Sequence, residues 1–364
     1  MALPKNTLWK FDPHTLGKHL VLRSYLNAWF PILGSWKNRI LFIDGFAGPG
    51  EYEDGEEGSP QIAMRALVDH SAKIGADVGF LFIEKDEERA KHLSEVVERW
   101  KAKLPGKSQA AVITGQFDDT MEEVFEDLDE KNKRLASAFV MIDPFGVSGT
   151  PMSVVERVLK NRQCEVFVSL MYEAINRFKN SKEFPDHLDE LFGCGDWREC
   201  VDIEDSEKRR KCFYNLYERQ LRAAGAKYVV HFDLYEGRRL IYSIFFATGH
   251  ELGCDRMKQA IWKITPEGGC EFRGTHTGQL TLGLEPDFDP LKRQLHERFG
   301  NGEWYQVEQF ETFMKSDATD YHSGQLRKGA LVPLEVGGFI EVDPTTRKRK
   351  NTYPKGCKLR FKKN

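Results

Sequence analysis

The sequence lacks three features that would place the protein in common functional classes. No stretch approaches the roughly 20 apolar residues that cross a bilayer, and the N-terminal residues MALPKNTLWK lack the apolar core of a signal peptide. The cysteines, at positions 164, 194, 200, 212, 254, 270 and 357, include no C-x-x-C pair. We therefore expect a cytoplasmic protein with reduced thiols, mostly buried or incidental, and no zinc cluster or other metal site.

The formal net charge is only −3, but the two signs are unevenly distributed along the chain. Residues 345–364 contain nine Lys or Arg and no acid, whereas residues 51–58 and 121–130 are acidic. A basic end on a nearly neutral chain indicates a polyanionic partner that is bound from that end. The alternative is a solvated terminus without a partner, and charge alone does not separate the two.

Short apolar segments alternate with amphipathic ones through the first half of the chain. We expect strands over residues 39–44, 78–84, 110–115, 137–143 and 164–171. Helical periodicity is present over residues 14–34, 59–70, 85–102, 118–128 and 151–160. The strands are continuous apolar runs, as expected where helices cover both faces of a sheet. The pattern predicts an α/β fold with a doubly wound, Rossmann-like parallel sheet.

The second half departs from this alternation. Residues 172–224 are helical and strand-free, which predicts an insertion after the fifth strand. Residues 227–235 and 239–248 predict an antiparallel pair with Glu236 and Gly237 at the turn. A helix over 252–264 would complete a first domain, 1–264, and residues 265–290, rich in Gly, Pro and Asp, predict a linker.

The last segment, residues 291–364, has the pattern of a winged helix-turn-helix domain. Helices over 291–300 and 307–316 precede a segment, 323–343, that combines a third helix with a short strand. The basic hairpin PTTRKRKNTY follows at 344–353. Pro333 lies inside the third helix, where proline shortens or kinks a helix.

The sequence RILFIDGFAGPGEY (39–52) ends an apolar run on an acid and then supplies three glycines. Such glycines let the backbone approach a ligand at the carboxyl end of a strand. The loop lacks the lysine of a P-loop, and its G-x-x-G-x-G spacing departs from the dinucleotide G-x-G-x-x-G. Asp44 directly before the loop would repel a pyrophosphate but attract the ammonium and sulfonium groups of S-adenosylmethionine.

Acids also lie at the ends of the second and fourth strands. Glu84 can accept hydrogen bonds from both hydroxyls of a ribose, as an acid does in dinucleotide folds. Asp143 opens the sequence Asp143-Pro144-Phe145-Gly146. Methylation of an exocyclic amine needs acceptors that orient the NH₂ and a ring that stacks on the base, and Asp143, the Pro144 carbonyl and Phe145 would supply them. The alternative is a tight turn set by Pro and Gly.

Several longer motifs resemble the three-Cys-motif partner (TcmP) family. They are K-H-x-x-L-x-x-Y-L-x-x-W (18–29), D-G-F-A-G-P-G-E-Y (44–52), G-S-P (58–60), I-D-P-F-G (142–146), M-Y-E-x-I-N-R-F (171–178) and M-K-Q-A-I-W-K (257–263). This resemblance implies a radical-SAM-like partner that carries a three-cysteine motif and is related to photoproduct lyases. More distantly, the chain is similar to the large-subunit ribosomal RNA adenine-N6 methyltransferases, although those carry D-P-P-[YF] where this chain has Asp143-Pro144-Phe145.

The resemblance assigns roles to individual residues. The glycine loop would wrap the methionine part of S-adenosylmethionine, Glu84 would hold the ribose and Asp118 would lie near the adenine. The complete expected cofactor set is Lys18, His19, Asp44, Gly45, Phe46, Ala47, Gly48, Gly50, Ser59, Glu84 and Asp118. Asp143, Pro144 and Phe145 would act in catalysis, and the expected substrate contacts are Gly146, Asn176, Arg177, Arg347, Lys348, Arg349 and Lys350. Lys18 with His19 is otherwise a surface pair, and Asn176 with Arg177 otherwise caps a helix.

These residues favour an S-adenosylmethionine-dependent methyltransferase that acts on nucleic acid, at an exocyclic amine such as adenine N6, together with a radical-SAM partner. A second hypothesis is a non-catalytic partner that brings DNA to a radical-SAM lesion-processing enzyme. A third, a metal-dependent nuclease or phosphoryl-transfer enzyme, lacks paired acid motifs. The sequence leaves DNA, RNA and small molecules open as substrates.

Overall fold

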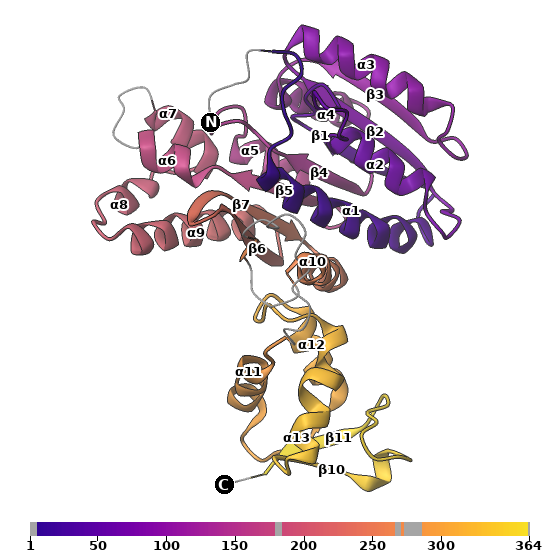
Figure 1. The fold of residues 1–364 in the computed structure, drawn as a ribbon, viewed down its shortest axis with the longest axis vertical. Coiled ribbons are helices and arrows are strands. Elements are labelled where there is room, and N and C mark those ends of the chain that lie inside the picture. The colour runs from indigo at the N-terminus through magenta and orange to yellow at the C-terminus, as the bar shows by residue number, and fades with distance from the viewer. Residues whose placement is uncertain (1–5, 179–183, 266–270, 273–285, 363–364) are drawn as a thin grey trace.

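The computed structural model describes residues 6–178, 184–265, 271–272 and 286–362. An α/β body forms the upper part of the molecule in Figure 1. A smaller C-terminal module, residues 286–362, lies below it.

An eight-stranded sheet forms the centre of the α/β body, with the strand order β3-β2-β1-β4-β5-β7-β6-β8. Strands β1 to β5 are parallel, whereas β7 is antiparallel to both of its neighbours, β5 and β6. The strands are β1 Arg39–Asp44, β2 Asp77–Glu84, β3 Gln109–Thr114, β4 Ala138–Ile142, β5 Glu165–Leu170, β6 Tyr228–Glu236, β7 Arg239–Thr248 and β8 Glu271–Phe272. The chain runs outward from β1 through β2 and β3 and then returns to the other side of β1 with β4. The doubly wound α/β sheet predicted from the sequence is confirmed.

Helices cover both faces of this sheet and form one apolar core on each side. On one face lie α1 Pro13–Gly34, α2 Ser59–Val68, α3 Glu87–Lys101 and α10 Glu251–Ile264. On the other lie α4 Phe117–Glu130, α5 Met152–Leu159 and the helical insertion. Every residue of β4 and β5 is buried, and this two-sided burial explains their continuous apolar sequences.

The insertion after β5 is helical in its described part, as predicted. It consists of α6 Tyr172–Phe178, α7 Pro185–Phe192, α8 Trp197–Val201 and α9 Ser206–Ala223. Cys200 and Cys212 form a disulfide with their Cα atoms 5.5 Å apart, so the expectation of reduced thiols throughout is wrong for this pair. The two sulfurs meet because α8 and α9 pack together, which the spacing of cysteines in the sequence does not indicate. Cys164, Cys194, Cys254 and Cys357 are free, and Cys270 lies outside the described residues.

Two short strands were not predicted. Most of the expected linker, at 266–270 and 273–285, lies outside the described residues, but β8 within it pairs in parallel with β6 and buries Phe272. In the C-terminal module, β9 pairs with β11. Strands of two residues are too short to show any periodicity. The turn of the β6–β7 pair contains Gly237 and Arg238 rather than Glu236 and Gly237, a shift of one residue.

The C-terminal module has an apolar core of its own. Its elements are α11 Asp289–Phe299, β9 Tyr305–Gln306, α12 Val307–Lys315, the helical turns Ser323–Gln325 and Leu326–Leu331, α13 Val332–Val336, β10 Ile340–Val342, the turn Pro344–Thr346 and β11 Lys358–Phe361. Pro333 lies in the first turn of α13, and a wide π-type turn precedes it. The helical stretch 326–336 continues through Pro333 with a change from π-type to α-type turns, so the shortening or kink expected there stays a prediction.

Polar contacts join this module to α10 of the α/β body. The Lys258 ammonium donates to the carbonyls of Met314, Ser316 and Thr319 at 2.5, 2.6 and 3.0 Å. The Trp262 indole N–H donates to the Asp320 carbonyl at 2.8 Å. No helix in the described ranges is long and apolar enough to cross a membrane.

Candidate active site

Three acids lie at the carboxyl edge of the sheet, as the strand assignments predict. Asp44 ends β1, Glu84 ends β2 and Asp143 follows β4, and these three strands are neighbours. The strand order reverses between β1 and β4, which is where ligands bind in open α/β sheets. Asp44 and Asp143 therefore flank the expected binding crevice.

Backbone hydrogen bonds fix the glycine loop between β4 and β2. The Gly45 N–H donates to the Met141 carbonyl at 2.9 Å and the Ala47 N–H to the Ile83 carbonyl at 3.0 Å. The Gly48 N–H donates to Glu84 Oε2 at 2.9 Å. Gly48 and Gly50 have φ values of +59° and +84°, a conformation that side chains disfavour. The path of the loop therefore depends on these two glycines.

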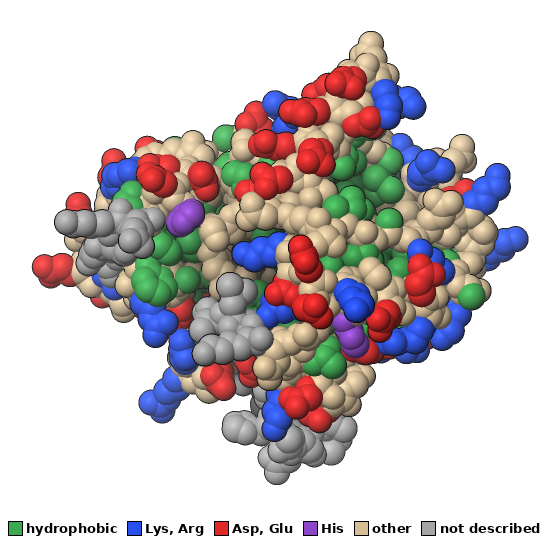
Figure 2. Space-filling model, turned by 90° about the horizontal axis from the view of Figure 1, so that it is seen from above, with side chains coloured by type: hydrophobic (Ala, Val, Ile, Leu, Met, Phe, Trp, Pro, Cys, Tyr) green, Lys and Arg blue, Asp and Glu red, His purple; other side chains and the backbone are tan. Residues whose placement is uncertain are grey.

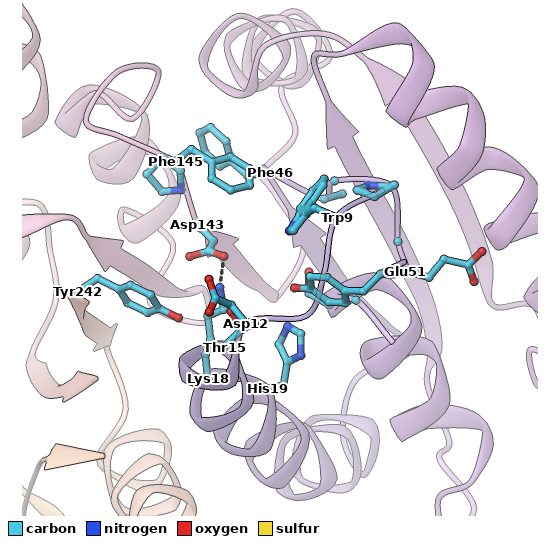
Figure 3. Close-up of a pocket in the computed structure, with 18 of the residues that line it drawn as sticks. Trp9, Asp12, Thr15, Lys18, His19, Phe46, Glu51, Asp143, Phe145 and Tyr242 are labelled. Atoms are coloured by element: carbon cyan, nitrogen blue, oxygen red, sulfur yellow. Dashed lines mark hydrogen bonds and ion pairs between the residues drawn. The ribbon is translucent and has the colours of Figure 1, made fainter. Parts of the chain in front are cut away.

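A cavity of about 400 Å³ opens beside this loop. Of the expected residues it is lined by Lys18, His19, Phe46, Ala47, Gly48, Gly50, Ser59, Asp143, Pro144 and Phe145. The other lining residues come from the N-terminal segment, α1, the glycine loop, the residue after β5 and β7: Trp9, Asp12, Thr15, Pro49, Glu51, Tyr52, Gly58, Met171 and Tyr242. Figure 3 shows these side chains arranged around a common space. The structure thus brings together the expected catalytic residues and most of the expected cofactor residues.

Lys18 and Asp143 form an ion pair across this cavity, from α1 to the turn after β4 (Figure 3). Their side chains are 8% and 21% exposed, so both are accessible from the cavity but largely removed from bulk water. Burial disfavours the ammonium, but the Asp143 carboxylate, with Tyr242 and Tyr52, outweighs burial and raises the pKa of Lys18. Lys18 is therefore a permanent cation and no base. Burial and the adjacent Lys18 lower the pKa of His19, which keeps its imidazole neutral.

Asp44 lies below the cavity and is fully buried. Its Oδ1 accepts the Phe46 N–H at 3.2 Å, and its Oδ2 has no hydrogen-bond partner among the described residues. Burial raises the pKa of the carboxyl to about 7, although the Ser59 hydroxyl and the Phe46 N–H favour the ionised form. The Ser59 hydroxyl favours the ionised carboxyl but makes no hydrogen bond to Oδ2.

A second, smaller cavity of about 50 Å³ adjoins the first. Gly45, Glu84 and Asp118 line it, and Phe46 and Phe145 line both cavities. Asp118 Oδ1 is buried without a hydrogen-bond partner in the part of the chain that the structure describes. The expected ribose and adenine residues therefore lie together, next to the expected methionine residues.

The expected substrate residues do not gather at the cavity in the same way. Gly146 follows Phe145 directly, and Asn176 on α6 accepts a hydrogen bond from Arg209 Nε at 3.0 Å. The Arg177 guanidinium lies 5.7 Å from the ring centre of Phe178. Both contacts are made within the insertion, and neither tests the alternative that these residues cap a helix.

The basic residues lie in the C-terminal module. Lys348 and Arg349 are exposed beside a wide groove, and Lys350 is exposed next to them. Arg347 is held instead in a half-buried ion pair with Glu335, so its guanidinium serves the fold of the module.

Sequence reasoning missed several aromatic walls of the main cavity. The Trp9 ring lies edge-on to Tyr52 and Phe145, with ring centres 5.9 and 5.7 Å apart, and it packs above Gly48. Tyr242 reaches the cavity from β7. Trp9 stands in a segment without periodicity and Tyr242 in a strand remote in the sequence, so neither carried a local signal. Tyr52 did carry a local signal, because it is the last residue of the D-G-F-A-G-P-G-E-Y motif (44–52).

No family model and no curated protein matches the chain. Among solved structures, it is similar to an O-methyltransferase from Bacillus cereus in complex with SAH, at 15% identity and a TM-score of 0.34 over 68% of this chain and 84% of that one. It is also similar to a METTL16 methyltransferase domain, at 14% identity and a TM-score of 0.31 over 63% and 83%. A third is protein LPL1258 from Legionella pneumophila, at 10% identity and 0.37 over 68% and 90%.

The resemblance to the TcmP family stays a prediction from the sequence motifs.

Proposed function

We propose that this chain is an S-adenosylmethionine-dependent methyltransferase that acts on an exocyclic amine of nucleic acid, such as adenine N6. The observation that carries the proposal is the Asp44 carboxyl, buried at the switch point of the sheet with one oxygen unpartnered. Buried polar atoms are nearly always paired, so this oxygen is suited to a ligand that brings a donor or a positive charge.

The residues present fit S-adenosylmethionine. Its methionine part has an ammonium and a sulfonium for Asp44, and the adenosine has hydroxyls for Glu84 and an amine for the unpartnered Asp118 Oδ1. Phe46 and Phe145 are shared by the two cavities, which suits one elongated ligand. A pyrophosphate would instead meet the buried acid Asp44.

The cofactor supplies an electrophilic methyl group when bound. The chain supplies orientation: the Asp143 carboxylate accepts an N–H of the amine, and the Phe145 ring offers a surface for the base. The cavity is walled by the aromatic residues Trp9, Phe46, Phe145 and Tyr242, and these exclude water from the reacting groups. No general base is needed, because the proton can leave the nitrogen after the transfer.

The proposed nucleic-acid contact belongs to the C-terminal module. Its order of helix, strand, helix, helix and two strands supports the winged helix predicted from the sequence. Lys348, Arg349 and Arg327 line a groove of about 770 Å³ there. Figure 2 shows the α/β body from above, with Asp and Glu side chains gathered at its upper edge and both signs of charge mixed elsewhere on this face. We assign the phosphate contacts to the module because its groove is lined by basic residues.

A second candidate function is favoured by the ion pair in the cavity. Because Asp143 is already bound by Lys18, the chain would be a non-catalytic partner if this pair is permanent. The resemblance to the TcmP family then suggests that the basic module brings DNA to a radical-SAM protein. The two candidates share one fold and differ in whether the chain itself forms a methylated product.

The test is mass spectrometry of nucleosides after incubation with methyl-labelled S-adenosylmethionine and mixed DNA and RNA, with and without a radical-SAM protein that carries the three-cysteine motif. We expect methylated nucleosides from the native chain. Asp143→Ala should lower transfer at least about 100-fold through lost orientation, while calorimetry shows cofactor binding no weaker than a few-fold below native. Binding without transfer by the native chain favours the recruiting role. No binding at millimolar S-adenosylmethionine would rule out the enzyme.

A further inference from the structure

We infer that Lys18 is a positioning residue that exchanges partners during the reaction cycle. Without cofactor it binds Asp143; with S-adenosylmethionine present it binds the cofactor carboxylate and leaves Asp143 free to accept the substrate amine. The inference rests on the proposed function. It makes cofactor binding a precondition of substrate binding, which gives the enzyme an ordered mechanism.

The first support is that Lys18 and Asp143 belong to separate elements and both face the cavity. Lys18 comes from α1 and Asp143 from the turn after β4, and both line the main cavity. A lysine side chain has four flexible carbons, so its ammonium can move without a shift of the helix. Its ammonium also lies 5.3 Å from the ring centre of Tyr242. The ring stabilises the positive charge while the ammonium moves between its two partners.

The second support is that Lys18 is the one cationic side chain among the described residues that line the main cavity. The neighbouring His19 is kept neutral, because burial and Lys18 lower its pKa. Arg89 lines the smaller cavity and lies 5.0 Å from the ring centre of Trp9. A carboxylate that enters the main cavity therefore has Lys18 as its available counter-ion.

The third support is the charge balance of the site. Asp143 raises the pKa of Asp44, and Lys18 lowers it, so the three groups already interact. If Lys18 left Asp143 with nothing in its place, the Asp143 carboxylate would act on the buried Asp44 without a compensating cation. The ammonium and sulfonium of the cofactor replace the charge that Lys18 withdraws. The positive and negative charges of the site therefore stay balanced during the exchange only when the cofactor is present.

The test compares S-adenosylmethionine with decarboxylated S-adenosylmethionine, which keeps the amine and the sulfonium, by calorimetry. We expect the native chain to prefer the carboxylated ligand by about tenfold or more, the value of one charged hydrogen bond. Lys18→Met should bind both ligands equally, and Lys91→Met, on an exposed face of α3, should behave like the native chain. Equal weakening for both ligands in Lys18→Met would show that Lys18 only shapes the cavity and would overturn the inference.

Asp143→Asn tests the same exchange from the other side. Removal of the competing carboxylate should tighten S-adenosylmethionine several-fold and leave the decarboxylated ligand unchanged. An adenine-containing oligonucleotide should bind the native chain measurably better with S-adenosylhomocysteine present than without it. Binding of the oligonucleotide at the same affinity in both conditions contradicts the ordered mechanism.

The outcomes separate the two levels of the proposal. If the native chain binds neither ligand at millimolar concentration, the proposed function fails and the inference falls with it. If it binds both equally well, the cofactor assignment stands and only the exchange of Lys18 fails. Melting temperatures of all variants identify any loss of affinity that reflects unfolding.

Discussion

Asp44 couples the proton balance of the site to ligand binding. Burial raises the pKa of its carboxyl to about 7, opposed by Ser59 and Phe46, whereas the unfolded value is about 3.9. Between these two values the folded chain binds a proton that the unfolded chain has lost. The contribution of Asp44 to the free energy of unfolding is therefore full at about pH 4 and is lost as the pH rises through 7.

A cationic ligand next to Asp44 should reverse this shift. We expect S-adenosylmethionine binding just below the pKa of about 7 to release a proton, because the positive charge favours the carboxylate. Calorimetry in two buffers with different ionisation enthalpies measures the released proton. Asp44→Asn should abolish the release. At a pH about one unit above that pKa, the melting temperature of Asp44→Asn should also be higher than that of the native chain.

The exposed acid Asp54, in the loop that follows, provides the matched control. Asp54→Asn should leave the proton release as it is in the native chain. If Asp44→Asn still releases the proton, a different group takes it up, and Asp44 is no contact of the cofactor.

The glycine loop is the element whose geometry is least tolerant of a side chain. A Cβ at Gly50 would lie 2.7 Å from Leu93 Cδ1, at a backbone φ of +84°. A Cβ at Gly55 would meet nothing within 4 Å, at a similar φ of +89°. The two positions therefore share the backbone strain and differ in packing.

We expect Gly50→Ala to destabilise the protein by about 2 kcal/mol or more, and Gly55→Ala by about 1 kcal/mol. Denaturant unfolding of the two variants measures the difference. S-adenosylmethionine affinity should fall only for Gly50→Ala, because only Gly50 lines the main cavity. Equal destabilisation would mean that Leu93 yields to the added methyl group.

Most elements of the α/β body could be predicted because their physical signals are local. The strand β1 has the predicted bounds, and the other parallel strands differ by one residue at one or both ends. Their bounds could be predicted because burial on both faces selects a continuous apolar run. The acids at strand ends followed from the same signal. Parallel neighbours bring their carboxyl ends to one edge, so Asp44, Glu84 and Asp143 converge.

The remaining features depend on contacts between residues distant in the sequence. The pairing of Lys18 with Asp143 joins positions 125 apart, and no local pattern encodes it. The Cys200–Cys212 disulfide arises from the packing of two helices. Trp9 and Tyr242 also line the cavity, but the sequence around each of them contains no pattern that predicts a binding site. Cavity walls are thus harder to predict than the strand ends on which the ligand would rest.

At the scale of the whole molecule, the C-terminal module is held to the α/β body by buried polar groups. Asp255 on α10 accepts the backbone N–H of Ser323 at 2.7 Å and its hydroxyl at 2.8 Å. Asp317 of the module accepts the Val229 N–H of β6 at 2.8 Å. These directional contacts orient the basic groove of the module relative to the cavity.

Lys258 is the centre of this junction. Its ammonium is 1% exposed and satisfies three carbonyls of the module, and burial lowers its pKa. Lys258→Met leaves those carbonyls without a donor, which should cost about 3 kcal/mol or more. We expect thermal unfolding to split into two transitions and the radius of gyration from X-ray scattering to increase, because the module separates before the α/β body unfolds. Lys263→Met, at an exposed position of the same helix, should keep one transition. If Lys258→Met does so too, the apolar contacts around Trp262 suffice to join the module to the body.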